Sequence, residues 1–214
     1  FAEAQYRESS VQYHEPRKGS ATEMRLPRRI DPTTEWPAGF QFSLSEPIQF
    51  ADMLEFKGDF RPDIGKAAKA ILVADSPALP REKRLALAAL QLQNRGLEGV
   101  VNPEQALRQA EAFRQFVKAQ FSPQQWLPKF PVDATINGRL LSADVDLLLE
   151  NEHTIVVCLF AKFAEGMKKW KDQAKAVAPF AGWLNGVLPA VFPEKTVTYR
   201  AIYPVEGHLI QIII

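Results

Sequence analysis

The chain has 214 residues, of which 46% are hydrophobic and 24% charged, a composition that is ordinary for a globular protein. Its 26 basic and 25 acidic side chains leave a net charge of +1, which excludes nucleic-acid binding through a global positive field. One cysteine excludes a disulfide framework and a thiolate metal site, and three scattered histidines exclude a histidine-rich site.

Residues 1–50 are rich in proline, glycine and charge and show no sustained period, so we expect an extended linker or arm. The remaining residues, 51–214, form the expected domain. The sequence starts at Phe1 rather than methionine, which suggests a piece of a longer protein. No signal peptide is evident, and no apolar run approaches the roughly 20 residues of a membrane helix. We therefore expect a cytoplasmic location and no membrane partner.

Helical periodicity predominates between about residues 60 and 121, and two segments there carry apolar residues at the spacing of one helix face. These residues are Ile64, Ala68, Ile71 and Leu72 in the first segment and Leu85, Ala88, Ala89 and Leu92 in the second. A third helix is expected from Pro103, because Asn102 can cap it and proline suits the first helical position. The sequence thus predicts a helical part before the strands.

From about residue 130 the hydrophobic period changes to two, which predicts strands. Residues 131–136 alternate, and Asn137-Gly138 is a strong hairpin signal leading into residues 139–150. Residues 154–160 are apolar on both faces, which indicates a central strand covered on each side.

A helix broken near Pro179 and two closing strands are expected after residue 161. The resulting β-β-β-α-β-β order over about residues 130–214 predicts an α/β fold with a mixed central sheet flanked by helices.

Asp144 and Asp146 stand within the apolar run of residues 139–150. Strand alternation places both side chains on one face, with Leu148 and Glu150, while Val145, Leu147 and Leu149 face the other way. A carboxylate pair beside an apolar strand is a common basis for Mg²⁺ sites in nucleases, because hard cations need oxygen ligands. Alternatively, Asp144 caps a bulge and Asp146 bonds neighbouring backbone or a lysine. Spacing alone leaves both interpretations open.

No glycine-rich nucleotide loop and no GxSxG nucleophile motif occur in the chain. Cys158 lies in the most apolar segment, and no histidine is placed to activate it, so we expect a buried and inert thiol.

Residues 60–214 resemble the C-terminal nuclease domain of RecB/AddA-type (UvrD-like superfamily 1) helicase–nucleases, of the PD-(D/E)XK superfamily. The family pattern is GxxxH on a helix, a strand with a metal-binding aspartate, a strand with D-x-K, and a helix with QxxxY. Here "GRLLSADVDLLLE" resembles the first strand, with Asp146 at the metal-binding position. Gln173 in "KDQAKAV" matches the glutamine, and "AIYPVEGHLIQI" resembles the closing strands. The resemblance implies a restriction-endonuclease-like core and a role in DNA repair and recombination.

The chain departs from the family at the positions that carry the chemistry. Cys158 and Phe160 stand where the family has D-x-K, Lys69 stands at the histidine, and Val177 at the tyrosine. One carboxylate plus water holds Mg²⁺ poorly, so the comparison implies a degenerate site with no catalytic residues, no metal and no other cofactor. We expect Lys69 to pair with the remnant Asp146 in the vacated metal position.

A rearranged site is the alternative: an active Mg²⁺-dependent DNA nuclease. Its displaced catalytic set would be Asp144, Asp146, Glu150 and Lys162.

Partners follow from the same resemblance: single- or double-stranded DNA, helicase domains of the same chain, and a partner subunit of a helicase–nuclease complex. The candidate DNA-binding residues lie on or before one helix and are Lys162, Lys168, Lys169, Lys171, Gln173 and Lys175. A basic helix can hold the DNA backbone without sequence preference, but it can equally be a solvated face.

Overall fold

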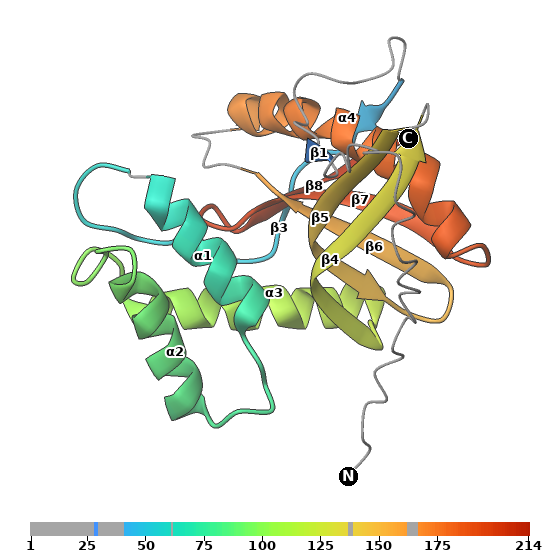
Figure 1. Cartoon of the computed structure of the whole chain (residues 1–214). Coiled ribbons are helices and arrows are strands. Elements are labelled where there is room, and N and C mark those ends of the chain that lie inside the picture. The colour runs from blue at the N-terminus through green and yellow to red at the C-terminus, as the bar shows by residue number, and fades with distance from the viewer. Residues whose placement is uncertain (1–27, 30–40, 61, 137–138, 162–166) are drawn as a thin grey trace, which may run out of the picture.

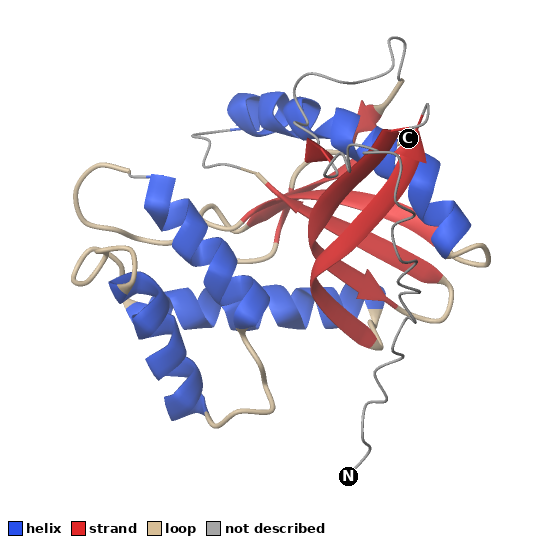
Figure 2. Ribbon diagram, viewed as in Figure 1, coloured by secondary structure: helices blue, strands red, loops and turns tan. Residues whose placement is uncertain are grey.

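The computed structural model of the chain describes residues 28–29, 41–60, 62–136, 139–161 and 167–214. The strands are β1 (Arg28–Arg29), β2 (Ser43–Leu44), β3 (Ile48–Gln49), β4 (Gln125–Ile136), β5 (Arg139–Glu150), β6 (Thr154–Phe160), β7 (Thr196–Tyr203) and β8 (His208–Ile213). The helices are α1 (Pro62–Ala74), α2 (Arg81–Gln93), α3 (Pro103–Phe121) and α4 (Met167–Val191). Their arrangement is an α/β fold with a mixed central sheet flanked by helices (Figure 1, Figure 2), which confirms the predicted class.

The sheet has eight strands in the order β1-β5-β6-β7-β8-β2, with β4 also paired to β5 and β3 to β8. β1 runs parallel to β5 and β6 parallel to β7, while the other pairs are antiparallel. Two hydrophobic clusters lie on the two faces. Helices α1 to α3 cover one face over β5 and β6, and α4 covers the other (Figure 1).

The three predicted helices of residues 60–121 are confirmed. The expected stripe of α1 is buried, and Ala88 and Leu92 bury the inner face of α2. At the start of α3 the side chain of Asn102 accepts a hydrogen bond from the backbone N–H of Glu104 at 2.9 Å. Pro103 takes the first helical position, so the sequence signals at this helix start act as expected.

The predicted β4–β5 hairpin forms and pairs Ile136 with Arg139, while Asn137-Gly138 lies outside the described residues. β4 begins six residues earlier than the alternation indicates, at Gln125. Residues 155–159 of β6 are all buried between β5 and β7, which confirms the doubly covered central strand.

The predicted break of the last helix near Pro179 is wrong, because α4 continues through this residue to Val191. A proline inside a helix removes one hydrogen bond and costs roughly 3 kcal/mol. The fully buried Ala178, Ala181 and Leu184 on either side of Pro179 offset that cost by packing against the sheet.

Three short strands, β1, β2 and β3, lie within residues 1–50, the stretch expected to form a linker or arm. β2 and β3 extend the sheet along β8, and β1 pairs with β5. Two-residue strands carry no readable period, so composition could not separate them from a linker. Gly207 lets the segment after β3 approach closely: its φ is +69°, and a Cβ there would lie 2.2 Å from the carbonyl oxygen of Ala51.

Among the described residues, none of the helices combines the length and apolar character needed to cross a membrane.

Candidate functional site

The candidate site lies where β5 and β6 separate. Their ladder runs from Glu150 opposite Ile155 to Leu147 opposite Cys158 and ends there, whereas β6 continues alongside β7 as far as Phe160. Beyond the end of the ladder, Oδ2 of Asp146 accepts a hydrogen bond from the backbone N–H of Phe160 at 3.3 Å. The carboxylate of Asp146 therefore accepts the hydrogen bond that a backbone carbonyl of β5 would accept if the ladder continued. This bond holds the side chain at the point where β5 and β6 separate.

Strict alternation of β5 fails at this point. Val145 and Leu148 both belong to the cluster under α4, and Leu147 lies in the cluster under α1 to α3. The expectation that Leu148 shares a face with Asp146, and Val145 with Leu147, is therefore wrong. Lys129 of β4 lies between Pro128 and Phe130, which pair with Leu147 and Val145, and has a φ of +49°, a left-handed conformation that locally distorts the strand pair.

Lys69 of α1 forms an ion pair with Asp146 through Nζ and Oδ1, as expected from the sequence. The same Nζ lies 5.7 Å from the centroid of the Phe160 ring, within range of a cation–π contact. The side chains of Lys69 and Asp146 are 39% and 29% exposed, so the pair stands at the rim of the core.

The two residues at the D-x-K positions supply packing. Cys158 is buried in the cluster under α1 to α3, and burial raises the pKa of its thiol to about 12. The ring of Phe160 lies 6.5 Å from that of Phe113 in an edge-on contact. The thiol stays protonated and inert, as expected, and neither side chain offers an oxygen ligand.

These donors do not fit a Mg²⁺ ion. Both carboxylate oxygens of Asp146 have partners, Lys69 and the N–H of Phe160. An ammonium group in ion-pair contact occupies the side of the carboxylate that a cation would need, and Mg²⁺ requires near-octahedral oxygen coordination. Within the described ranges, no group of three or more His, Cys, Asp or Glu side chains could hold a metal ion.

Two members of the alternative set, Asp146 and Glu150, lie apart on β5. Glu150 lies four residues along β5 from Asp146, roughly 13 Å at strand spacing. Its Oε1 accepts from Nζ of Lys195 at 2.5 Å, at the opposite end of the β5–β6 ladder. Asp144 is exposed on β5, and Lys162 lies outside the described residues.

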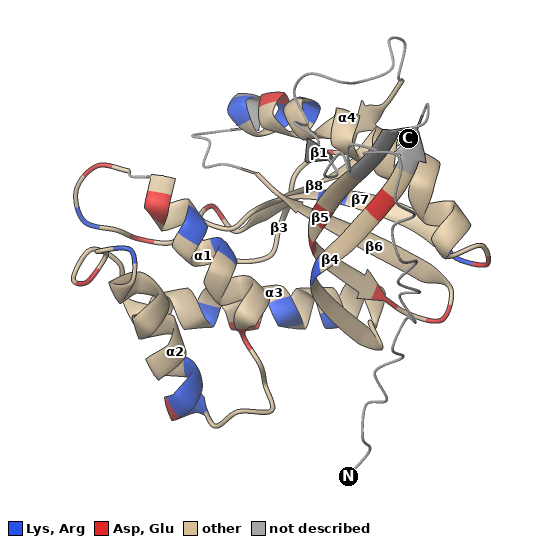
Figure 3. Ribbon diagram, viewed as in Figure 1, with Lys and Arg blue, Asp and Glu red and all other residues tan. Residues whose placement is uncertain are grey.

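The basic residues of α4 stand beside one acidic residue of the same helix, Asp172 (Figure 3). Nζ of Lys171 lies 2.8 Å from Glu46, and Nζ of Lys175 lies 3.3 Å from Asp172. Lys169 is exposed and Gln173 half-buried, while nothing is described of the side chain of Lys168. Two of the candidate lysines, Lys171 and Lys175, thus belong to a surface that carries both positive and negative charge.

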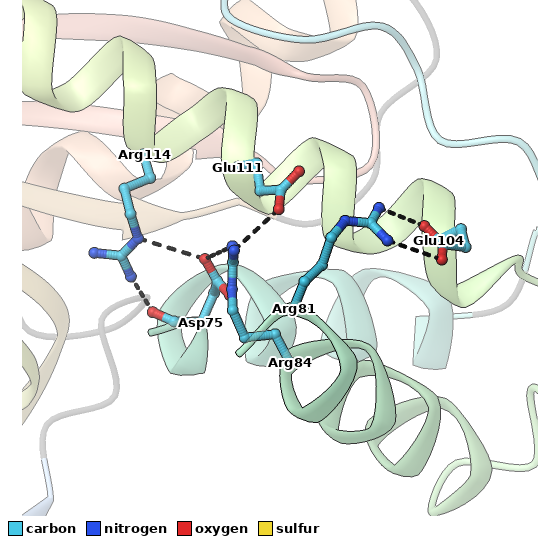
Figure 4. A network of polar contacts seen from close by, with 6 residues as sticks. All are labelled: Asp75, Arg81, Arg84, Glu104, Glu111 and Arg114. Atoms are coloured by element: carbon cyan, nitrogen blue, oxygen red, sulfur yellow. Dashed lines mark hydrogen bonds and ion pairs between the residues drawn. The ribbon is translucent and has the colours of Figure 1, made fainter. Parts of the chain in front are cut away.

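Sequence reasoning missed a second polar cluster, in the helical part (Figure 4). Asp75, just after α1, is 2% exposed and accepts two hydrogen bonds from Arg84 of α2, at 2.7 and 2.8 Å. Arg114 of α3 donates to the carboxylate at 3.4 Å and also to the Asp75 backbone carbonyl. Glu111 accepts from the second arm of Arg84 at 3.0 Å. One acid thereby joins all three helices.

The electrostatics of this cluster follow from burial and pairing. The hydrogen bonds to Asp75 raise the pKa of Arg84, whereas burial lowers the pKa of Arg114. The guanidinium of Arg114 also lies 4.1 Å from the ring centroid of Trp126. A sequence signal existed, because Arg84 precedes the inward-facing Ala88 by four residues and so lies on the buried stripe of α2.

No protein-family model matches this chain, and no curated protein matches it.

Proposed function

We propose that this chain is the nuclease-like domain of an ATP-dependent DNA helicase–exonuclease of the PD-(D/E)XK type, acting in double-strand break repair and recombination. In this proposal the domain itself is not catalytic and binds no metal, the parent chain carries helicase domains, and the location is cytoplasmic. The domain guides DNA or holds a partner subunit.

One observation carries the proposal. Asp146, the residue that matches the metal-binding aspartate, lies at the end of the β5–β6 ladder but bonds Lys69 and the Phe160 backbone. The ammonium group of Lys69 gives this carboxylate the positive charge that a metal ion would otherwise provide. Unlike a metal ion, it cannot activate water or stabilise a leaving oxygen. The position is thus converted from metal chemistry to a structural contact.

Between the two roles, the described contacts of α4 favour holding a protein. Lys171 and Lys175 each have an acidic neighbour within 4 Å, which lowers the local positive potential that DNA backbone binding requires. Exposed ion pairs of this kind are weak, so DNA phosphates can compete with the acidic residues for these lysines, and DNA binding has to be measured.

A nuclease assay on linear DNA tests the absence of catalysis. We expect no Mg²⁺- or Mn²⁺-dependent cleavage by the wild-type chain, and none by Asp146→Ala. Asp133→Ala, an exposed aspartate on the adjacent β4, is the matched control. Cleavage that persists in the control but is lost in Asp146→Ala would establish the rearranged nuclease instead.

Fluorescence anisotropy with labelled single- and double-stranded DNA separates the two non-catalytic roles. At ~50 mM salt we expect weak binding that does not respond to Lys171→Glu or Lys175→Glu. Tight, salt-sensitive binding that these substitutions weaken would favour the DNA-guiding role.

A further inference from the structure

Arg200 is a half-buried cation with no acidic partner. It lies on β7 with its guanidinium carbon 5.4 Å from the centroid of the Phe121 ring, and burial lowers its pKa. Nη1 donates to the backbone carbonyl of Tyr199 at 2.9 Å. Among the described residues no carboxylate forms an ion pair with it.

This situation differs from that of the other half-buried guanidinium groups on the same side of the sheet. Arg84 and Arg114 share the carboxylate of Asp75. Arg200 has five N–H donors, and the structure satisfies one of them through Tyr199. The end of α3 at Phe121 contributes a partial negative charge, which is less than a counter-ion provides. A partly desolvated cation of this kind is best stabilised by an anion that the described part of the chain does not supply.

Two exposed apolar side chains lie on the same face of the sheet as Arg200, toward β8 and β3. Gln211 of β8 is its direct cross-strand neighbour, and Ile213, two residues on, is 47% exposed. Ile48 of β3 pairs with Leu209, which lies two residues before Gln211, and is 44% exposed. We call Ile48, Phe121, Arg200, Gln211 and Ile213 the Arg200 surface.

Helices α1 to α3 cover this face over β5 and β6 (Figure 1). Ile48 of β3 and Ile213 of β8 nevertheless remain exposed. A single guanidinium beside an aromatic ring and exposed apolar side chains is typical of the centre of a protein interface, where arginine and aromatic residues are enriched. A DNA backbone needs several cations along its path instead.

We propose that the Arg200 surface binds an apolar protein segment bearing one carboxylate, which pairs with Arg200 while its apolar side chains cover Ile48 and Ile213. The surface uses residues of α3, β3, β7 and β8 and does not include Asp146, so the inference does not depend on the role of Asp146 or on the nuclease resemblance.

The test uses the full chain and two displayed libraries of short peptides with alternating apolar residues. The central residue is glutamate in one library and glutamine in the other. We expect enrichment of the glutamate library alone, and a loss of affinity of about tenfold or more for the selected peptides with Arg200→Gln. Ile213→Ser, at a half-exposed position, should weaken binding without threatening the fold.

Lys83→Gln and Leu90→Ser are the matched controls, since both residues are exposed on the outer side of α2. They should leave the affinity unchanged. Equal enrichment of both libraries, no enrichment at all, or selected peptides that bind Arg200→Gln as well as wild type would overturn the proposal. Arg200-dependent binding of a double-stranded oligonucleotide in place of the peptides would overturn it in favour of nucleic acid.

Discussion

Two acidic residues of this chain pair with cations in different ways. Asp75 is 2% exposed and joins Arg84 and Arg114, which come from two different helices. Asp146 is 29% exposed and pairs with Lys69 at the point where two strands separate. Arginine forms a planar fork that matches a carboxylate, whereas lysine is a point charge on a flexible stem.

The difference teaches which acid the fold depends on. The carboxylate of Asp75 has almost no access to water and would be unstable without its two guanidinium partners. Asp146 retains partial contact with solvent, so its pairing with Lys69 contributes less to stability. In the proposed function this pair matters for the chemistry of the position, where it takes the place of a metal, more than for the stability of the fold.

Replacement of Asp75 should have the largest effect. Asp75→Ala leaves Arg84 and Arg114 without their shared counter-ion, so we expect a loss of about 3–5 kcal/mol in the free energy of unfolding. Urea denaturation followed by circular dichroism measures this. Glu104→Gln, which breaks the exposed contact to Arg81 in the same helical part, is the control and should have a much smaller effect. Equal losses of unfolding free energy in Asp75→Ala and Glu104→Gln would contradict the view that the fold depends on the buried carboxylate of Asp75.

A double-mutant cycle on Lys69 and Asp146 tests the second pair. Lys69→Met and Asp146→Asn should each lower the free energy of unfolding by about 1–2 kcal/mol, with a coupling of about 1 kcal/mol between them. Asparagine retains an oxygen that can accept from the Phe160 N–H, so the cycle isolates the charge interaction. A coupling near zero, or a rise in stability with Asp146→Asn, would mean that this carboxylate is not held by Lys69.

Alkaline pH should reveal the buried thiol beside this pair. The pKa of Cys158 is about 12 in the folded chain, because burial disfavours the thiolate, and close to 9 when unfolded. Its contribution to stability is therefore complete below about pH 9 and is lost as pH rises toward about 12.

Between about pH 8 and pH 10 the wild type should lose about 1 kcal/mol more in the free energy of unfolding than Cys158→Ala does. Tyr199 and Tyr203, whose pKa values burial also raises, are present in both proteins and cancel in the difference. Identical pH dependences would show that the thiol ionises as readily in the folded chain as in the unfolded one.

The residues that could be predicted from sequence are those with local or family-specific signals. The apolar stripe of α1, the cap at Asn102 and the pairing of Lys69 with Asp146 all follow from spacing or from the position of a family residue. What failed depends on tertiary context. The alternation of β5 breaks next to Asp146, where β4 has a positive φ at Lys129, and packing of α4 against the sheet overrides Pro179.

The cluster around Asp75 was missed for a related reason. Its members lie in three segments, and nothing in the spacing of Asp75, Arg84 and Arg114 shows that they meet. A charged residue on a buried helical stripe, such as Arg84, indicates that a partner is needed but not which one.

Binding of Mn²⁺, followed by electron paramagnetic resonance on the wild-type chain and on Asp146→Ala, tests the central claim most directly. If Lys69 has replaced the metal, both proteins should give the same weak, non-saturating binding. A saturable site in the wild type that disappears in Asp146→Ala would show that this carboxylate still holds a metal ion and would contradict the account.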